Sequence, residues 1–100
     1  MSEQQLLSIV VPNDLRDDVV DVLAACDLVS GFSMSAMAGY SREHSQYDVR
    51  EQVEGYRALC QFEVLHQRVD QDGLLACLRQ AFTATAIRYW ITPVLEHGHL

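Results

Sequence analysis

Arginine and tyrosine side chains gather in the polar stretch that runs from Gly39 to Gly55 and just beyond it. Six residues there could contact a ligand: Tyr40, Arg42, His44, Tyr47, Arg50 and Arg57. Guanidinium groups bind carboxylates and phosphates through paired hydrogen bonds, and tyrosine is a frequent anchor at protein interfaces. The stretch is therefore predicted to bind an anionic effector or an acidic partner.

Acidic residues in the same stretch offer a second interpretation of its arginines. Four carboxylates lie close in sequence: Glu43, Asp48, Glu51 and Glu54. Ion pairs between exposed side chains are common and contribute little to stability. A solvated surface with internal ion pairs is therefore the alternative to a binding site.

The C-terminal tail carries a possible metal-binding group, namely Glu96, His97 and His99. Two histidines at i and i+2 on an extended segment face the same way, and imidazole binds copper, zinc and nickel well. A structural zinc site normally needs four ligands, which one tail lacks but several tails in an oligomer could supply. The alternative is a frayed terminal segment without a bound metal, so copper or zinc is a candidate and no cofactor is certain.

The remaining reactive side chains do not indicate catalysis. The three cysteines, Cys26, Cys60 and Cys77, are odd in number and lie in apolar segments, so we expect buried free thiols. His66 is expected to have a structural or surface role rather than to bind metal. The chain has no nucleophile-elbow pattern, no His-Glu-x-x-His motif and no Cys/His pair at a recognisable spacing. We therefore predict a binding protein and not an enzyme.

Composition narrows the class of partner. The chain has 100 residues, enough for one small domain spanning 1–100, and its 14 acidic and 7 basic side chains give a net charge of -7. This charge argues against nucleic acid, whose binding modules usually carry a basic surface. No apolar run approaches the roughly 20 residues that cross a bilayer, and the N-terminus lacks a signal-peptide pattern. A cytoplasmic protein that is not inserted in a membrane is expected.

Hydrophobic periodicity predicts the elements that position these side chains. Apolar and alternating runs predict strands over residues 6–11, 32–38, 56–66 and 88–95. Helical spacing predicts two helices with these apolar faces: Leu15, Val19, Val22, Leu23 and Cys26 in the first, and Leu74, Leu75, Leu78, Ala81 and Phe82 in the second. Asn13 or Asp14 and, later, Asp70 are the predicted helix N-caps.

The order β-α-β, long loop, β-α-β predicts an α+β fold, the ferredoxin-like βαββαβ sandwich. In it, a four-stranded antiparallel sheet carries two helices on one face, with the first and third strands in the centre. The long loop, residues 40–54, connects the second and third strands, and loops of this length are often functional. The other sheet face carries Leu and Met beside polar groups, which favours burial in a homo-oligomer.

The chain resembles the PII-like superfamily, to which the nitrogen-regulatory PII proteins and the CutA divalent-ion tolerance proteins belong. Within it, the chain is most similar to an uncharacterised proteobacterial PII-like family often encoded beside RND-type heavy-metal efflux systems. The segments that carry the resemblance are residues 30–33 (Ser-Gly-Phe-Ser), 39–44, 50–56, 62–64, 88–90 (Arg-Tyr-Trp) and 92–94 (Thr-Pro-Val).

The resemblance implies a homotrimer in which residues 40–54 take the place of the T-loop, the segment that contacts partners in PII proteins. It further implies a signalling role, with a membrane transporter for heavy-metal export as a possible partner. ATP binding is not expected, because residues 83–86 (Thr-Ala-Thr-Ala) lack the glycines of a phosphate-binding loop. The alternative function is that of a CutA-like protein that binds divalent metal ions.

Overall fold

A computed structural model describes residues 3–40, 56–83 and 87–100 of the chain. Its elements follow in the order β1 (Gln4–Pro12), η1 (Asn13–Leu15), α1 (Arg16–Ala25), β2 (Phe32–Gly39), β3 (Arg57–Gln67), η3 (Arg68–Asp70), α3 (Gln71–Ala81) and β4 (Arg88–Pro93). The strands form one antiparallel sheet in the order β2-β3-β1-β4. The predicted fold is confirmed, with the first and third strands in the centre and the second and fourth at the edges.

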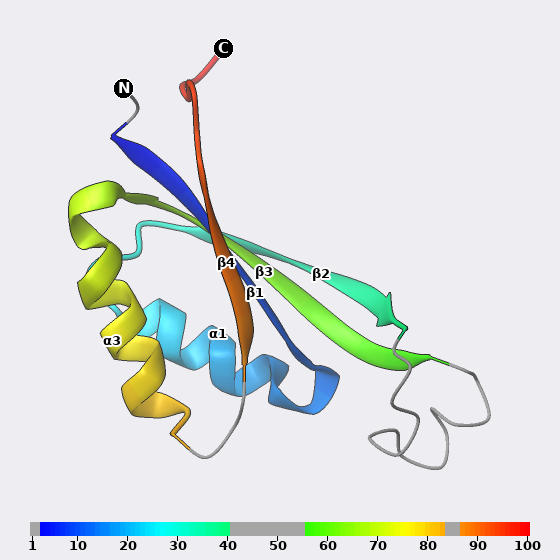
Figure 1. Ribbon diagram of the computed structural model, residues 1–100. Coiled ribbons are helices and arrows are strands. Elements are labelled where there is room, and N and C mark those ends of the chain that lie inside the picture. The colour runs from blue at the N-terminus through cyan, green and yellow to red at the C-terminus, as the bar shows by residue number, and fades with distance from the viewer. Residues whose placement is uncertain (1–2, 41–55, 84–86) are drawn as a thin grey trace.

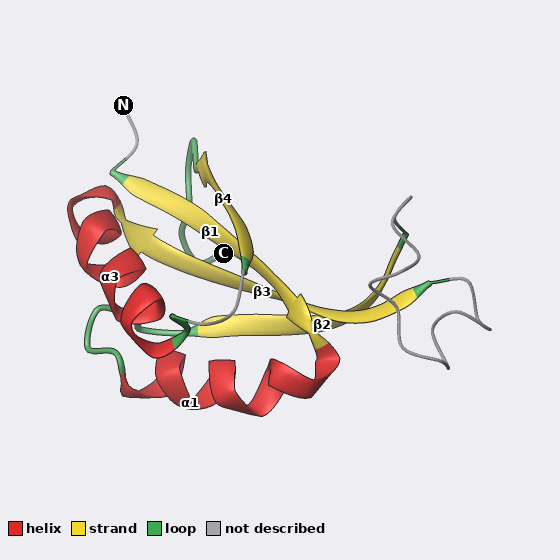
Figure 2. Cartoon of the chain, turned by 60° about the horizontal axis from the view of Figure 1, so that its bottom comes forward, coloured by secondary structure: helices red, strands yellow, loops and turns green. Residues whose placement is uncertain are grey.

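Both helices lie on the same side of the sheet (Figures 1 and 2). The core between the layers follows the strand alternation, because Leu7, Ile9 and Val11 of β1 pair with Val64, Phe62 and Cys60 of β3. Helix α1 adds Val19 and Leu23, and α3 adds Leu74 and Leu75. These buried side chains confirm most of the two predicted helix faces. Ala81, predicted to be buried, is exposed, because it lies at the last residue of α3, where the helix leaves the sheet.

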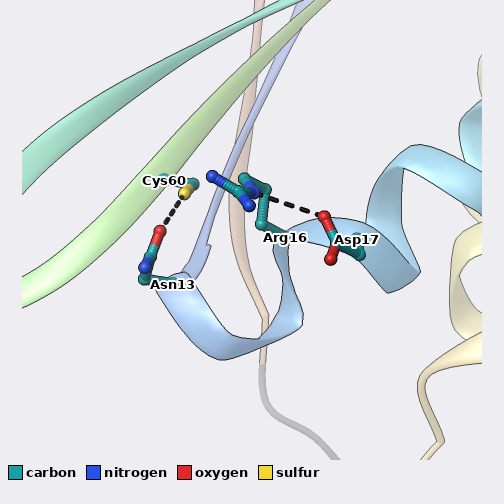
Figure 3. Close-up of polar contacts among 4 residues, drawn as sticks. All are labelled: Asn13, Arg16, Asp17 and Cys60. Atoms are coloured by element: carbon teal, nitrogen blue, oxygen red, sulfur yellow. Dashed lines mark hydrogen bonds and ion pairs between the residues drawn. The ribbon is translucent and has the colours of Figure 1, made fainter.

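The helix starts differ from the prediction. A short 3-10 turn precedes each helix, and the residues at the N-cap positions, Leu15 and Asp70, donate or accept no side-chain capping hydrogen bond. The Asn13 side chain instead reaches back to the sheet, where its Oδ1 accepts a hydrogen bond of 2.9 Å from the buried Cys60 thiol (Figure 3). Asn13 therefore ties the β1–α1 connection to β3 rather than capping α1. An exposed ion pair, Arg16 with Asp17 at 3.3 Å, adds little there.

β1 extends beyond its predicted range at both ends, whereas β4 ends at Pro93, two residues before the predicted end. β1 begins at Gln4, where the backbone carbonyl accepts a hydrogen bond from Val94 N at 3.1 Å, so the segment after β4 stays beside β1. β2 and β3 run on past the helix layer toward the connection between them (Figure 1). Ala36, Ala38 and Ala58 lie on the helix side of this extension and are exposed, because no helix covers them. We call this extension, residues 36–39 with 57–60, the β2–β3 arm.

Among the described residues, no helix is both long and apolar enough to cross a membrane.

Candidate functional site

The end of the β2–β3 arm presents two of the six predicted ligand-contacting residues. Tyr40 follows the last residue of β2 and is 78% exposed. Its ring lies 6.1 Å from that of Tyr56, at an interplanar angle of 49°, so the two tyrosines bracket the connection where it leaves and re-enters the sheet. Arg57 is half-buried and pairs with Gly39 across the strands. The other four residues, Arg42, His44, Tyr47 and Arg50, lie outside the described residues.

Gly39 has a local reason to be glycine. A Cβ atom built on it would come within 2.3 Å of the Leu59 Cδ1 atom, well inside van der Waals contact. The Leu59 side chain therefore occupies the space that a larger residue at position 39 would fill. This close approach brings the arm's two strands together next to Tyr40 and Arg57.

The sheet face opposite α1 and α3 is a second candidate surface. Strand pairing places its side chains in four rows that run across the sheet. The two middle rows are Ser33, Glu63, Ser8 and Trp90, and then Ser35, Gln61, Val10 and Arg88. The two outer rows are Leu65, Leu6 and Thr92 at one end, and Met37, Leu59 and Pro12 at the other. We call these rows the open sheet face.

The open sheet face keeps apolar surface in contact with water. Trp90 is 39% exposed, and the Arg88 guanidinium lies 5.8 Å from the centre of its ring, a cation–π distance. Leu6, Val10, Leu59 and Leu65 are half-buried on this face, opposite to the side on which the two described helices lie. The sequence showed the mixed character of this face in β3, but only the strand order shows that a tryptophan and an arginine from β4 join it.

The C-terminal tail lies beside a hollow of about 310 Å³ at the end of the sheet. His97 lines it together with these polar side chains: Gln4, Asp27, Ser30, His66 and Asp70. Glu96 and His99 are exposed on the same tail. Within residues 3–40, 56–83 and 87–100, no three His, Cys, Asp or Glu side chains are grouped closely enough to hold a metal ion. A metal site shared between tails of several subunits stays a prediction.

His66 has the structural role that the sequence indicated. The side chain is 3% exposed, and its Nδ1 lies 2.9 Å from the Gln67 carbonyl oxygen. A ring nitrogen at this distance from a carbonyl donates its proton, so the neutral ring has its lone pair on Nε2. That atom is buried and has no hydrogen-bond partner among the described residues.

The cysteines depart from the prediction in one respect. Cys26 and Cys60 are buried free thiols as expected, whereas Cys77 is only half-buried. The Cys26 thiol donates a hydrogen bond to Cys77 Sγ over 3.3 Å, although the two residues are 51 positions apart. Sequence spacing gave no signal for this contact, because each cysteine simply continues the apolar face of its own helix.

A second hollow, of about 440 Å³, lies beside Thr83, where the resemblance would place a nucleotide-binding loop. Two carboxylates, Asp18 and Asp21, line it together with Val22, Ala81 and Phe82. Negative charge at this position repels phosphate groups.

Comparison with known proteins identifies the family. Residues 1–100 match the family described as "Protein of unknown function (DUF3240)", and the chain belongs to it. A crystal structure of a DUF3240 protein from Shewanella baltica OS155 is 38% identical, with a TM-score of 0.82 over 100% of this chain and 99% of that one. No curated protein matches the sequence.

Two more distant structures share the fold. One is CPII, a nitrogen regulatory PII-like protein from Thiomonas intermedia K12, bound to ADP, AMP and bicarbonate; it is 13% identical, with a TM-score of 0.70 over 97% of this chain and 96% of that one. The other is CutA1 from the psychrotrophic bacterium Shewanella sp. SIB1, 13% identical, with a TM-score of 0.70 over 97% and 86%. At this identity the likeness shows the fold alone, and it is the fold of the PII-like and CutA-like proteins.

Proposed function

We propose that this DUF3240 protein is a non-enzymatic, cytoplasmic regulatory protein of the PII-like kind, which assembles as a homotrimer and binds a partner or small effector through its 40–54 loop. The observation that carries the proposal is the β2–β3 arm. It extends beyond the helix layer and holds Tyr40, 78% exposed, and Arg57 at the base of the connection. Such an arrangement places a contact surface away from the core, so that binding there need not disturb the fold.

The open sheet face supports the assembly. A domain of about 100 residues buries only about two-thirds of its unfolded surface, so covering a second sheet face adds substantially to its stability. Trp90, Leu6, Val10 and Leu65 provide apolar surface for this contact. Gln61 and Glu63 give it polar groups that can fix the orientation of the neighbouring subunit.

The ligand of the loop is proposed to be an acidic protein surface or a small anion other than ATP. Arginines at positions 42, 50 and 57 favour carboxylate or phosphate groups. The carboxylates of Asp18 and Asp21 beside Thr83 work against a nucleotide held in the PII manner. The resemblance to proteins encoded beside heavy-metal efflux systems favours a membrane transporter for metal export as the partner.

A loop replacement tests the proposal. Because Gly39 pairs with Arg57, residues 41–55 are exchanged for a two-residue Asn-Gly turn, which suits an antiparallel hairpin in this register. Binding of wild type and variant to the detergent-solubilised efflux transporter is then measured by surface plasmon resonance, with Val69→Ser as control, because Val69 is 80% exposed and lies in η3, before α3. We expect the replacement alone to abolish binding. Unchanged binding by the loop variant would refute the proposed role of the loop.

A metal-binding function of the CutA kind is the second candidate, and the position of His97 favours it. This side chain lines the hollow at the end of the sheet, Glu96 and His99 lie exposed on the same tail, and imidazole binds copper and zinc. Calorimetric titration with Cu(II), Zn(II) and Ni(II) separates the two candidates, with His97→Ala and His99→Ala as variants. Binding that is weak and equal in all three proteins would reject a dedicated metal site.

A further inference from the structure

Two cysteine thiols meet between the helices, on the side of the molecule opposite the open sheet face. Cys26 is the residue at which α1 ends, and Cys77 lies within α3. Their sulfur atoms are 3.3 Å apart and both cysteines are free. We propose that Cys26 and Cys77 are an oxidative modification site, at which a peroxide converts the two thiols into a reversible disulfide that joins the end of α1 to α3.

The geometry requires little movement. A disulfide bond is about 2.05 Å long, so the sulfurs must approach by roughly 1.2 Å, which small side-chain rotations can supply. The backbone at Cys26 is already fixed by two hydrogen bonds, from Cys26 N to the Leu23 carbonyl and from Val29 N to the Cys26 carbonyl. Both cysteines therefore belong to elements that are ordered before the bond forms, and the disulfide would not have to rearrange either helix.

The difference in exposure assigns the order of the reaction. Cys77 is half-buried, whereas Cys26 is 7% exposed, so a peroxide reaches Cys77 first. The Cys77 thiolate attacks a peroxide oxygen, the O–O bond breaks, and Cys77 becomes a sulfenic acid while one water leaves. The Cys26 sulfur then attacks the sulfenic sulfur, the S–O bond breaks, and a second water leaves. In total the two thiols lose two electrons and two protons, and the peroxide is reduced to two waters.

The electrostatic surroundings should make oxidation of these two thiols by peroxide slow at neutral pH. The pKa of the Cys77 thiol is raised above its ordinary value of 9.0, first by the thiol–thiol hydrogen bond with Cys26, which favours neutral Cys77 when Cys77 supplies the shared proton, then by burial and by the charges of Cys26 and Asp27. Because the thiolate is the reacting form, oxidation should accelerate as the pH rises. A site of this kind responds to a sustained oxidant load and remains reduced under ordinary cytoplasmic conditions.

The third cysteine provides an internal control. Cys60 is 1% exposed on β3, and its thiol donates to Asn13 Oδ1 rather than to another sulfur. It shares the protein environment and the oxidant with the other two residues but has a different neighbour. Oxidation specific to the proposed pair must therefore leave Cys60 as a free thiol.

The test is a thiol count on the intact protein after treatment with hydrogen peroxide. Wild type should retain one alkylatable thiol, and peptide mapping without reductant should yield a Cys26–Cys77 cross-linked peptide that dithiothreitol abolishes. Closing a loop of about 50 residues should also raise the melting temperature by about 10 °C or more. Cys60→Ser should show the same cross-link. Cys26→Ser should stop at a sulfenic acid on Cys77, which dimedone traps.

Three results would overturn the proposal: all three thiols remaining reactive after peroxide, a cross-link that includes Cys60, or disulfides formed only between separate chains. The wild-type measurement alone decides these outcomes, so the proposal stays falsifiable even where a serine variant fails to fold. The site lies on the helix side of the sheet, and the proposed trimer is not needed for any of these readouts.

Discussion

Replacing Trp90 with serine should weaken the proposed association between subunits while leaving each subunit folded. Trp90 lies on the open sheet face with 39% of its surface in water. A tryptophan of about 250 Å² therefore offers roughly 100 Å² for burial against a neighbouring subunit, worth about 2.5 kcal/mol at about 25 cal/mol per Å². If a neighbouring subunit covers only half of this area, the association free energy lost per interface is about 1.2 kcal/mol. The substitution should therefore weaken each interface by about 1–2.5 kcal/mol.

The effect on the proposed homotrimer is larger, because each of its three interfaces would lose the same contact. A loss of 1.4 kcal/mol is a tenfold change in a dissociation constant, so a loss of about 1–2.5 kcal/mol at each of three interfaces should shift the overall equilibrium between trimer and monomers by about 10² to 10⁵. Sedimentation velocity over a series of protein concentrations measures the shift. The Trp90→Ser monomer itself should remain folded, since the side chain is absent from the core, and its cation–π partner Arg88 is exposed.

The neighbouring residue supplies a matched control. Tyr89 is 44% exposed on the same strand but points to the helix-covered side, where its hydroxyl accepts a hydrogen bond from Arg79 at 3.3 Å. Tyr89→Ser removes a similar exposed aromatic surface without touching the open sheet face. The reasoning is refuted if both variants dissociate equally, or if Trp90→Ser sediments like wild type at every concentration.

Two further predictions concern the ends of the arm and of α1. Gly39→Ala should lower the free energy of unfolding by about 1 kcal/mol, because the new Cβ forces Leu59 into another rotamer. Gly31→Ala is the control: no atom lies within 4 Å of its new Cβ, so the free energy of unfolding should change by less than about 0.5 kcal/mol. Urea denaturation of both variants and wild type measures the difference. Asn13→Ala should cost about 1 kcal/mol by leaving the buried Cys60 thiol without its acceptor, and an unchanged midpoint would show that this hydrogen bond is immaterial.

The fold was predictable because the order of apolar and alternating runs is clear, and the alternation is most regular in β3. In β3 the even-numbered residues Cys60, Phe62 and Val64 are buried and the odd-numbered residues are half-buried, as the sequence pattern indicated. The role of Asn13 was not predictable, because its side chain could in principle accept a hydrogen bond from the helix backbone or from the Cys60 thiol. Its choice of the Cys60 thiol over the helix backbone depends on a strand 47 residues further along the chain.

Some residues of the candidate sites could also be placed from the sequence, and others could not. Tyr40 and Arg57 could be placed at the base of the loop from local sequence, since they follow directly from where β2 ends and β3 begins. The Cys26–Cys77 contact and the rows of the open sheet face could not, because they join residues from different elements. Such contacts are set by helix packing and by the register between strands, and neither leaves a trace in the spacing of a single sequence.

β3 links the fold to the proposed assembly, because one strand supplies side chains to both faces of the sheet. Phe62 lies fully buried beneath the helices, while its neighbours Gln61 and Glu63 lie in the middle rows of the open sheet face. A shift of one residue in the pairing of this strand would exchange the two sets and expose Phe62. Pairing that buries the core therefore also determines which side chains a neighbouring subunit meets. Substitutions at odd-numbered positions of β3 should for this reason alter association, while those at even-numbered positions should alter stability.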